Sequence, residues 1–175
     1  MAALTAVGAH LRLPLPYVPV TLQVTFVCLA GLWLGPWHGA ASQLVYLTAG
    51  LIGFPLFAKG GGPQYVLEPS FGYLVGFVPG ALLVGYVARG ARALPRIVLA
   101  TYAGIAAIYA CGLAHLLLVL VWAAQTPLSL TAVIRLGLAP VPKDLVLGLV
   151  AAYASLRLRA AGLEPGTETR GPGQR

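Results

Sequence analysis

Charged residues are scarce in this sequence, and their scarcity limits the kinds of protein that it can encode. Charged side chains make up 9% of the 175 residues, whereas hydrophobic side chains make up 59%. Soluble globular domains carry about 25% charged residues, so an ordinary soluble domain is excluded. Several stretches approach the roughly 20 apolar residues that a helix needs to cross a bilayer. The composition therefore predicts an all-α integral membrane protein.

Cysteine is also rare, and the motifs of several kinds of site are missing. Cys28 and Cys111 each stand alone in an apolar stretch, which indicates packing residues instead of a disulfide or a metal pair. The three histidines are far apart in the predicted topology, so no metal site is expected. The phosphate-binding pattern GxxxxGK[ST] does not occur. The basic residues form no single stripe, so we expect no nucleic-acid binding, and we expect no cofactor.

The apolar stretches predict a bundle of six transmembrane helices. They cover residues 1–10 and about 20–34, 39–53, 71–88, 97–122 and 143–158. The first is short, about half a span at 1.5 Å per residue. The prolines of 12–19 and the segment 123–139 predict loops. We expect one membrane domain over 1–160 and a disordered tail over 161–175, where glycine, proline and charge replace apolar residues.

The distribution of basic residues predicts the orientation of the bundle. If both termini lie in the cytoplasm, seven basic residues lie inside and four outside. The inside set is Arg89, Arg92, Arg96, Arg157, Arg159, Arg170 and Arg175, and the outside set is Arg12, Lys59, Arg135 and Lys143. The positive-inside rule favours this arrangement. The segment 12–19, the glycine-rich loop and the start of the last helix then face outward.

Polar residues gather on the predicted outer side. Asp144 follows Lys143 at the start of the last predicted helix. Two interpretations stay open there, and both can hold: Asp144 caps the helix, and the charge pair holds a polar ligand at the mouth of a pocket. Gln23, Gln43 and Tyr73 add hydrogen-bonding groups, which either join helices or contact a ligand.

A glycine-rich loop interrupts the apolar sequence after residue 53. Gly61 and Gly62 belong to a run of three glycines, and glycine permits positive φ and close backbone approach. The loop is either a lid over a small-molecule pocket or purely structural. Lys59 and Glu68, which flank it, are expected to form a surface ion pair.

Small residues recur every four positions on two predicted helices. Gly72, Gly76 and Gly80 form one such stripe, and we expect it to pack against another helix inside the bundle. Ala2 and Ala6 form a shorter stripe on the first helix.

Four segments resemble the BioY family, the biotin-binding substrate components of energy-coupling-factor transporters. They are PVTLQ at 19–23, LIGFPLFA at 51–58, PSFGYLVGF at 69–77 and PKD at 142–144. The resemblance covers nearly the whole chain up to about Leu158. It implies a six-helix protein of a bacterial or archaeal plasma membrane that captures biotin on its outer side without catalysis. It also implies a transmembrane coupling protein and two cytoplasmic ATPases as partners.

The resemblance also implies roles for individual residues. In the family, an acidic residue near the last helix and a lysine three positions later approach biotin. The acid here is Asp144, whereas Leu147 stands at the position of the lysine and Lys143 is adjacent to the acid. The expected ligand-binding set is Asp144, Lys143, Tyr73, Phe57, Gln23, Gln43, Gly61 and Gly62. Ala2 and Ala6 resemble the alanine motif that contacts the coupling protein.

Within this set, the chemistry of biotin suggests a division of labour. Its rings and aliphatic tail suit Phe57, Tyr73 and the glycine loop, and its ureido group suits Asp144 with a glutamine. Lys143 is then available for the carboxylate. Two other functions stay open: a substrate component for thiamine or riboflavin, and a membrane-embedded lipid-modifying enzyme. The enzyme would need a convergent acid/base or nucleophile set, which the sequence does not display.

Overall fold

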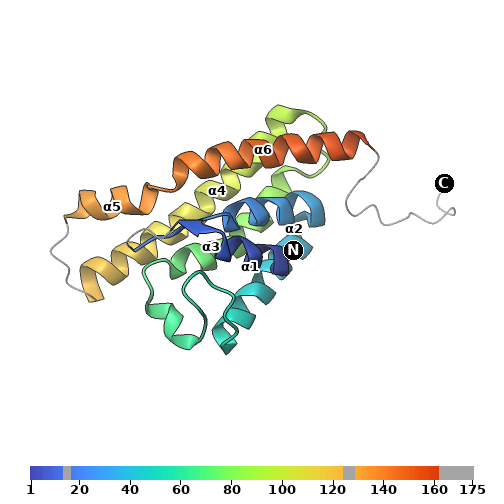
Figure 1. The fold of residues 1–175 in the computed structure, drawn as a ribbon. Coiled ribbons are helices and arrows are strands. Elements are labelled where there is room, and N and C mark those ends of the chain that lie inside the picture. Colours follow the sequence, from blue (N-terminus) through green and yellow to red (C-terminus); the bar gives the residue numbers. More distant parts are fainter. Residues whose placement is uncertain (14–16, 124–128, 162–175) are drawn as a thin grey trace.

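The computed structural model describes residues 1–13, 17–123 and 129–161. Its regular secondary structure there is helical apart from one two-stranded ribbon and an isolated bridge between Phe57 and Gly60 (Figure 1). The predicted all-α class is confirmed at this level. The predicted tail lies outside the described residues from position 162 onward. The elements in chain order are α1 (Ala2–His10), β1 (Arg12–Leu13), β2 (Val20–Thr21), α2 (Gln23–Ile52), the 3-10 helix η1 (Pro63–Leu67), α3 (Phe71–Val87), α4 (Leu94–Leu117), the π-helical η2 (Leu118–Ala123), α5 (Leu130–Leu138) and α6 (Val141–Ala160).

The long helix α2 consists of two halves that meet at a kink. Gly35 has φ 75° and ψ −176°, angles that interrupt the helix, and Pro36 follows it. A Cβ atom at Gly39 would lie 2.9 Å from the carbonyl oxygen of Ala30, so the second half approaches the end of the first closely. The predicted break between residues 34 and 39 is therefore confirmed.

The glycine stripe of α3 packs against α4, as predicted. A Cβ atom at Gly72 would lie 2.3 Å from the Cβ of His115, and one at Gly76 would lie 2.9 Å from the Cα of Ile108. Any larger side chain at these positions would have to push the two helices apart. Close contact between α3 and α4 thus depends on the absence of side chains along this stripe.

Two connections contain more structure than we predicted. The segment 12–19 was expected to be a loop, but its start forms an antiparallel ribbon in which Arg12 pairs with Thr21 and Leu13 with Val20. The connection 123–139 contains α5, whose first turn is capped by the Ser129 hydroxyl, which accepts a 3.3 Å hydrogen bond from the Ala132 N–H. Strands of two residues carry no detectable periodicity, which is why the ribbon was missed.

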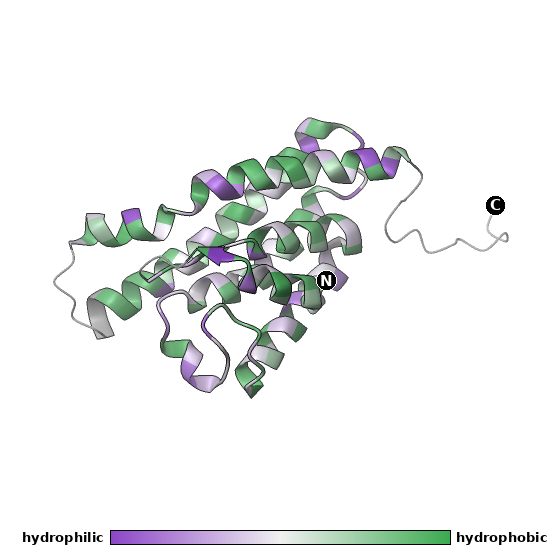
Figure 2. Cartoon of the chain, viewed as in Figure 1, coloured by the Kyte–Doolittle hydropathy of each residue, from purple (hydrophilic) through white to green (hydrophobic). Residues whose placement is uncertain are grey.

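Hydropathy is distributed as expected for a membrane protein. Two helices, Gln23–Ile52 and Leu94–Leu120, are long and apolar enough to cross a bilayer, and Phe71–Val87 is apolar but shorter. Figure 2 shows α6 apolar along its middle, with hydrophilic residues near both of its ends. Val146 and Val150, which are 62% and 56% exposed, form part of the outer face of α6. Such a face suits contact with lipid.

The helix ends gather at two opposite ends of the bundle. One end contains the starts of α2, α3 and α6, and Asp144 lies there. The other end contains the kink of α2, the connection between α3 and α4, and the end of α6, where Arg159 lies. We call these the Asp144 end and the Arg159 end.

Candidate functional site

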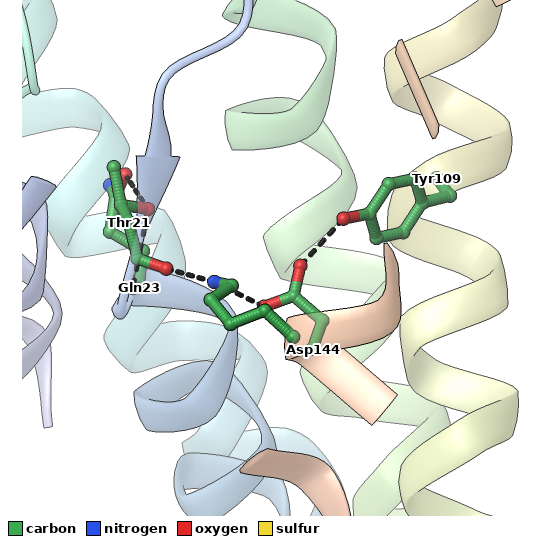
Figure 3. A network of polar contacts seen from close by, with 5 residues as sticks. Thr21, Gln23, Tyr109 and Asp144 are labelled. Atoms are coloured by element: carbon green, nitrogen blue, oxygen red, sulfur yellow. Dashed lines mark hydrogen bonds and ion pairs between the residues drawn. The ribbon is translucent and has the colours of Figure 1, made fainter. Parts of the chain in front are cut away.

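A buried carboxylate lies at the centre of the Asp144 end. Asp144 stands in the first turn of α6 and is 2% exposed. Its Oδ2 accepts a 2.6 Å hydrogen bond from the hydroxyl of Tyr109 on α4 (Figure 3). Its Oδ1 lies 2.5 Å from the Nζ of Lys143. The carboxylate therefore joins α4 to α6 and carries its own counter-ion, as a buried charge requires.

The network continues from Lys143 to the opposite wall of the site. The Lys143 ammonium donates a hydrogen bond to the carbonyl oxygen of Thr21 in β2. The Thr21 hydroxyl donates to the Oε1 of Gln23 at 3.0 Å, and the Nε2 of Gln23 donates to the hydroxyl of Tyr46 at 2.7 Å. The Tyr46 hydroxyl in turn donates to the carbonyl oxygen of Leu56 at 3.2 Å. One chain of contacts thus connects α6, the ribbon, α2 and the glycine-rich loop.

One atom of this network keeps unused hydrogen-bonding capacity. The Oδ1 of Asp144 is buried and pairs with the Lys143 ammonium, and no second donor among the described residues contacts it. A carboxylate oxygen has two lone pairs, and a buried acceptor gains from being hydrogen-bonded. The site can therefore accept an N–H or O–H group from a ligand.

The network surrounds a cavity of about 40 Å³. Tyr65, Tyr73 and Phe77 contribute aromatic wall, and Gln23, Lys143 and Asp144 contribute polar wall. The Tyr73 and Tyr109 rings lie edge to face with centroids 5.4 Å apart. Burial raises the pKa of the Tyr65 phenol, so this group stays protonated at neutral pH. The site combines aromatic surface with neutral and charged hydrogen-bonding groups, as small-molecule sites commonly do.

Comparison with known proteins identifies the family. A model of the BioY family matches residues 1–163. The chain belongs to the BioY family. A probable biotin transporter BioY from Lysinibacillus sphaericus is 48% identical over 69% of this chain and 63% of its own length. The biotin transporter BioY from Thermotoga maritima is 36% identical over 93% of each chain.

A solved structure supports the fold. The crystal structure of the S-component for biotin from an ECF-type ABC transporter aligns with a TM-score of 0.78 and 22% identity, covering 91% of this chain and 86% of that one. The BioY relatives are named as transporters, in agreement with our prediction that the chain is not an enzyme. Among the described residues, no three His, Cys, Asp or Glu side chains lie together as metal ligands would.

Half of the predicted ligand-binding set of this BioY-family chain meets at the cavity. Gln23, Tyr73, Lys143 and Asp144 all line it. Tyr73 is held there by its hydroxyl, which donates a 2.9 Å hydrogen bond to the carbonyl oxygen of Gly137 in α5. The remaining four residues lie elsewhere, and their role in binding stays a prediction.

Phe57 and Gln43 have other partners. Phe57 is fully buried, with its ring centroid 4.6 Å from that of Tyr65 and 5.4 Å from that of Tyr46. Phe57 therefore packs against Tyr46 and Tyr65 without lining the cavity itself. Gln43 is fully buried and accepts a 3.2 Å hydrogen bond from the hydroxyl of Thr5, which joins α2 to α1.

Gly61 and Gly62 allow the loop to pack on the end of α2. The N–H of Gly62 donates to the carbonyl oxygen of Gly50 at 2.8 Å, and Gly62 has φ 107°, which favours glycine. A Cβ atom at Gly61 would lie 2.1 Å from the carbonyl oxygen of Phe54. These contacts account for the glycines structurally, whereas the predicted lid role stays a prediction.

The sequence did not point to Tyr109, which is 6% exposed and bonded directly to Asp144. Its position in the middle of a long apolar run gives only a weak signal. A tyrosine at membrane depth needs a partner for its hydroxyl, and a buried acid needs a donor. A tyrosine and an acid that both lie in apolar segments are therefore candidates to bond to each other.

Ala2 and Ala6 lie along the side of α1 that faces the bundle. Ala6 is 8% exposed and Ala2 is half-buried, and both pack against the core. Leu4 and Val7 on the other side are 44% and 52% exposed. That the alanines contact a coupling protein stays a prediction. The exposed side of α1, with Leu4 and Val7, lies next to them on the same helix.

Proposed function

We propose that this chain is the biotin-binding substrate component of an energy-coupling-factor transporter. Family membership, the names of the relatives and the fold likeness support this function. Asp144 carries the proposal on the structural side, because its buried carboxylate lines the cavity beside aromatic rings and its Oδ1 has a second lone pair for a ligand donor. Biotin combines a ureido group, apolar rings and a carboxylate, and each has a complementary group at this cavity.

The ureido group offers two N–H donors and one carbonyl acceptor. The Oδ1 of Asp144 accepts one N–H. The amide of Gln23 can accept from the second N–H or donate to the ureido carbonyl. The bicyclic rings lie against Tyr73 and Phe77. Lys143, whose side chain is 26% exposed, meets the carboxylate at the outer mouth.

Binding requires the site to open. A cavity of about 40 Å³ is far below the roughly 300–1,000 Å³ of typical small-molecule pockets. The contact between Lys143 and the Thr21 carbonyl closes the site between α6 and the ribbon. Moving the ammonium from that carbonyl and from the Oδ1 of Asp144 to the biotin carboxylate would open the wall and free Oδ1 for the ureido N–H. The ammonium then exchanges its present contacts for a charged pair with the ligand.

The chain is multi-pass in the plasma membrane, with six spans and both termini in the cytoplasm. The spans are α1, the two halves of α2, and α3, α4 and α6. The positive-inside count supports this orientation, with seven basic residues inside and four outside. The Asp144 end then faces outward, where it captures biotin. The surrounding membrane lipid contacts the exposed apolar residues.

Uptake depends on other proteins. Energy supplied by a transmembrane coupling protein and two cytoplasmic ATPases agrees with the lack of a GxxxxGK[ST] phosphate loop in this sequence. Ala2 and Ala6 on α1 stay our candidates for contact with the coupling protein.

The first test is a melting experiment on the detergent-purified chain. A ligand present at 100 times its Kd stabilises the folded state by about 2.7 kcal/mol. Biotin should raise the melting temperature, whereas thiamine and riboflavin should leave it unchanged. A rise with thiamine or riboflavin alone would assign the chain to another vitamin.

A further inference from the structure

A second and much larger cavity lies at the Arg159 end. Its volume is about 830 Å³, within the roughly 300–1,000 Å³ typical of ligand pockets. Its walls come from the kink of α2, the connection between α3 and α4, and the end of α6. None of the residues around Asp144 takes part in it. The proposed biotin site therefore does not explain this cavity.

The cavity is basic. Arg89, Arg92 and Arg159 line it, together with His38, and none of the described residues that line it is acidic. In the described part of the chain the acids are Glu68 and Asp144, which belong to elements of the Asp144 end. The positive charge of the cavity is therefore not neutralised by the described residues, and an anion would gain from entering it.

Arg159 is held in a fixed position in the wall. Its guanidinium donates one hydrogen bond to the carbonyl oxygen of Ala91 at 3.1 Å and another to that of Leu32 at 2.7 Å. Its Nε is buried without an acceptor among the described residues. Neutral carbonyls orient the guanidinium but leave its full charge in place. A preorganised arginine of this kind suits a phosphate, which accepts two hydrogen bonds in a fork geometry.

The rim of the cavity is aromatic and apolar. Trp33, Leu34 and Trp37 line it, and Trp37 is 73% exposed. Tryptophan is enriched at the boundary between bilayer and water, where headgroups lie. A basic cavity with this rim fits a ligand that has an anionic head and an apolar tail.

We propose that the cavity binds the phosphate headgroup of an anionic phospholipid. The phosphate lies between Arg89, Arg92 and Arg159, and the acyl chains leave along Trp33 and Trp37. This site is independent of biotin binding, and only its assignment to the cytoplasmic leaflet rests on the proposed orientation. Bound lipid would connect the kink of α2 to the connection between α3 and α4 and to the end of α6.

The test is native mass spectrometry of the full chain in detergent, with phosphatidylglycerol and phosphatidylcholine of identical acyl chains. Phosphatidylglycerol should remain bound and phosphatidylcholine should not. The double variant Arg89→Ala/Arg92→Ala should weaken phosphatidylglycerol binding by roughly fivefold for each arginine removed. Both side chains are exposed, so the fold should persist. Thermal stabilisation by biotin on the same sample checks the fold.

The matched control is Arg12→Ala/Arg135→Ala, which removes two exposed arginines outside the cavity and should leave lipid binding unchanged. Equal retention of the two lipids, or equal losses in the two double variants, would overturn the proposal. Inorganic phosphate that stabilises the chain as much as phosphatidylglycerol would assign the cavity to a soluble anion instead. Loss of coupling-protein binding in Arg89→Ala/Arg92→Ala with lipid binding intact would make it a docking surface.

Discussion

The hydroxyl of Tyr109 lies 2.6 Å from the Oδ2 of Asp144, and this contact joins the middle of α4 to the first turn of α6. Both side chains are buried, at 6% and 2% exposure. The tyrosine occupies one oxygen of the carboxylate and leaves the other for Lys143 and a ligand. The relationship makes Asp144 more than a helix cap: the N-cap of α6 is Pro140, and the Asp144 carboxylate in the first turn pairs with Tyr109 of α4 and with Lys143.

Replacing Asp144 tests its role as an acceptor for the ligand. Asp144→Asn keeps the size and an oxygen that accepts from Tyr109, but it removes the charge next to Lys143. Hydrogen bonds to charged groups contribute about 1.5–3 kcal/mol, so biotin affinity should fall at least tenfold while the melting temperature changes little. Titration calorimetry measures the first and a thermal melt the second. Glu68→Gln is the control, because Glu68 forms the predicted exposed ion pair with Lys59 at 2.7 Å. If Asp144→Asn binds biotin with unaltered affinity, Asp144 has a structural role only.

Removing the Tyr109 hydroxyl should both destabilise the fold and weaken binding. Tyr109→Phe leaves the Oδ2 of the buried carboxylate without its donor, which costs about 1–3 kcal/mol. Tyr102→Phe is the matched control on the same helix, because its hydroxyl donates a 3.4 Å hydrogen bond to the Leu145 carbonyl away from the cavity. Melting and calorimetry on both variants give the comparison. Equal effects of the two substitutions would contradict a special role for Tyr109.

The proposed contact between Lys143 and the biotin carboxylate can be tested by changing the ligand. Lys143→Met removes the ammonium, so the chain should lose its preference for biotin over biotin methyl ester, which lacks the carboxylate charge. A charged hydrogen bond corresponds to a preference of at least about tenfold. Because both ligands are compared on the same variant, any change in stability cancels. An unchanged preference would show that another group meets the carboxylate.

The small stripe on α1 predicts an effect on assembly. Ala2→Leu adds bulk to a half-buried position and should reduce co-purification with the coupling protein, without reducing biotin binding. Ala6 is a poorer choice, because it packs into the core and its enlargement would shift α1 itself. Ala3→Leu, at the neighbouring exposed position, should have less effect. If Ala2→Leu co-purifies as the unaltered chain does, the stripe does not contact the partner.

Much of the fold could be predicted because apolar runs and their interruptions are local features. Gly35 followed by Pro36 predicted the break in α2, and the glycines of α3 predicted its close packing on α4. The ribbon depends on pairing between Arg12 and Thr21, nine positions apart, through strands too short to show a pattern. The sequence does not predict helix α5, because a segment of nine residues that lies between Pro127 and Pro140 and contains Gly137 resembles a loop.

The site was harder to predict because it depends on contacts between distant residues. Asp144 and Lys143 stood out as charges in an apolar chain, and Gln23 and Tyr73 as polar groups near helix ends. Tyr109 is 35 positions from Asp144, and nothing in the local sequence announces their contact. The sequence suggests Gly61 and Gly62 as ligand-binding residues. In the structure the loop packs closely against the backbone of Gly50 and Phe54, and these contacts explain why side chains are absent at both positions.

The most direct test of biotin capture is a calorimetric titration of the purified full chain with biotin, and with thiamine and riboflavin in parallel. We expect saturable binding of one biotin per chain and no saturable heat with the other two vitamins. The heat-capacity change should be negative, because the rings of biotin leave water for an aromatic wall. Absence of biotin binding in a chain that melts cooperatively would contradict the proposed function.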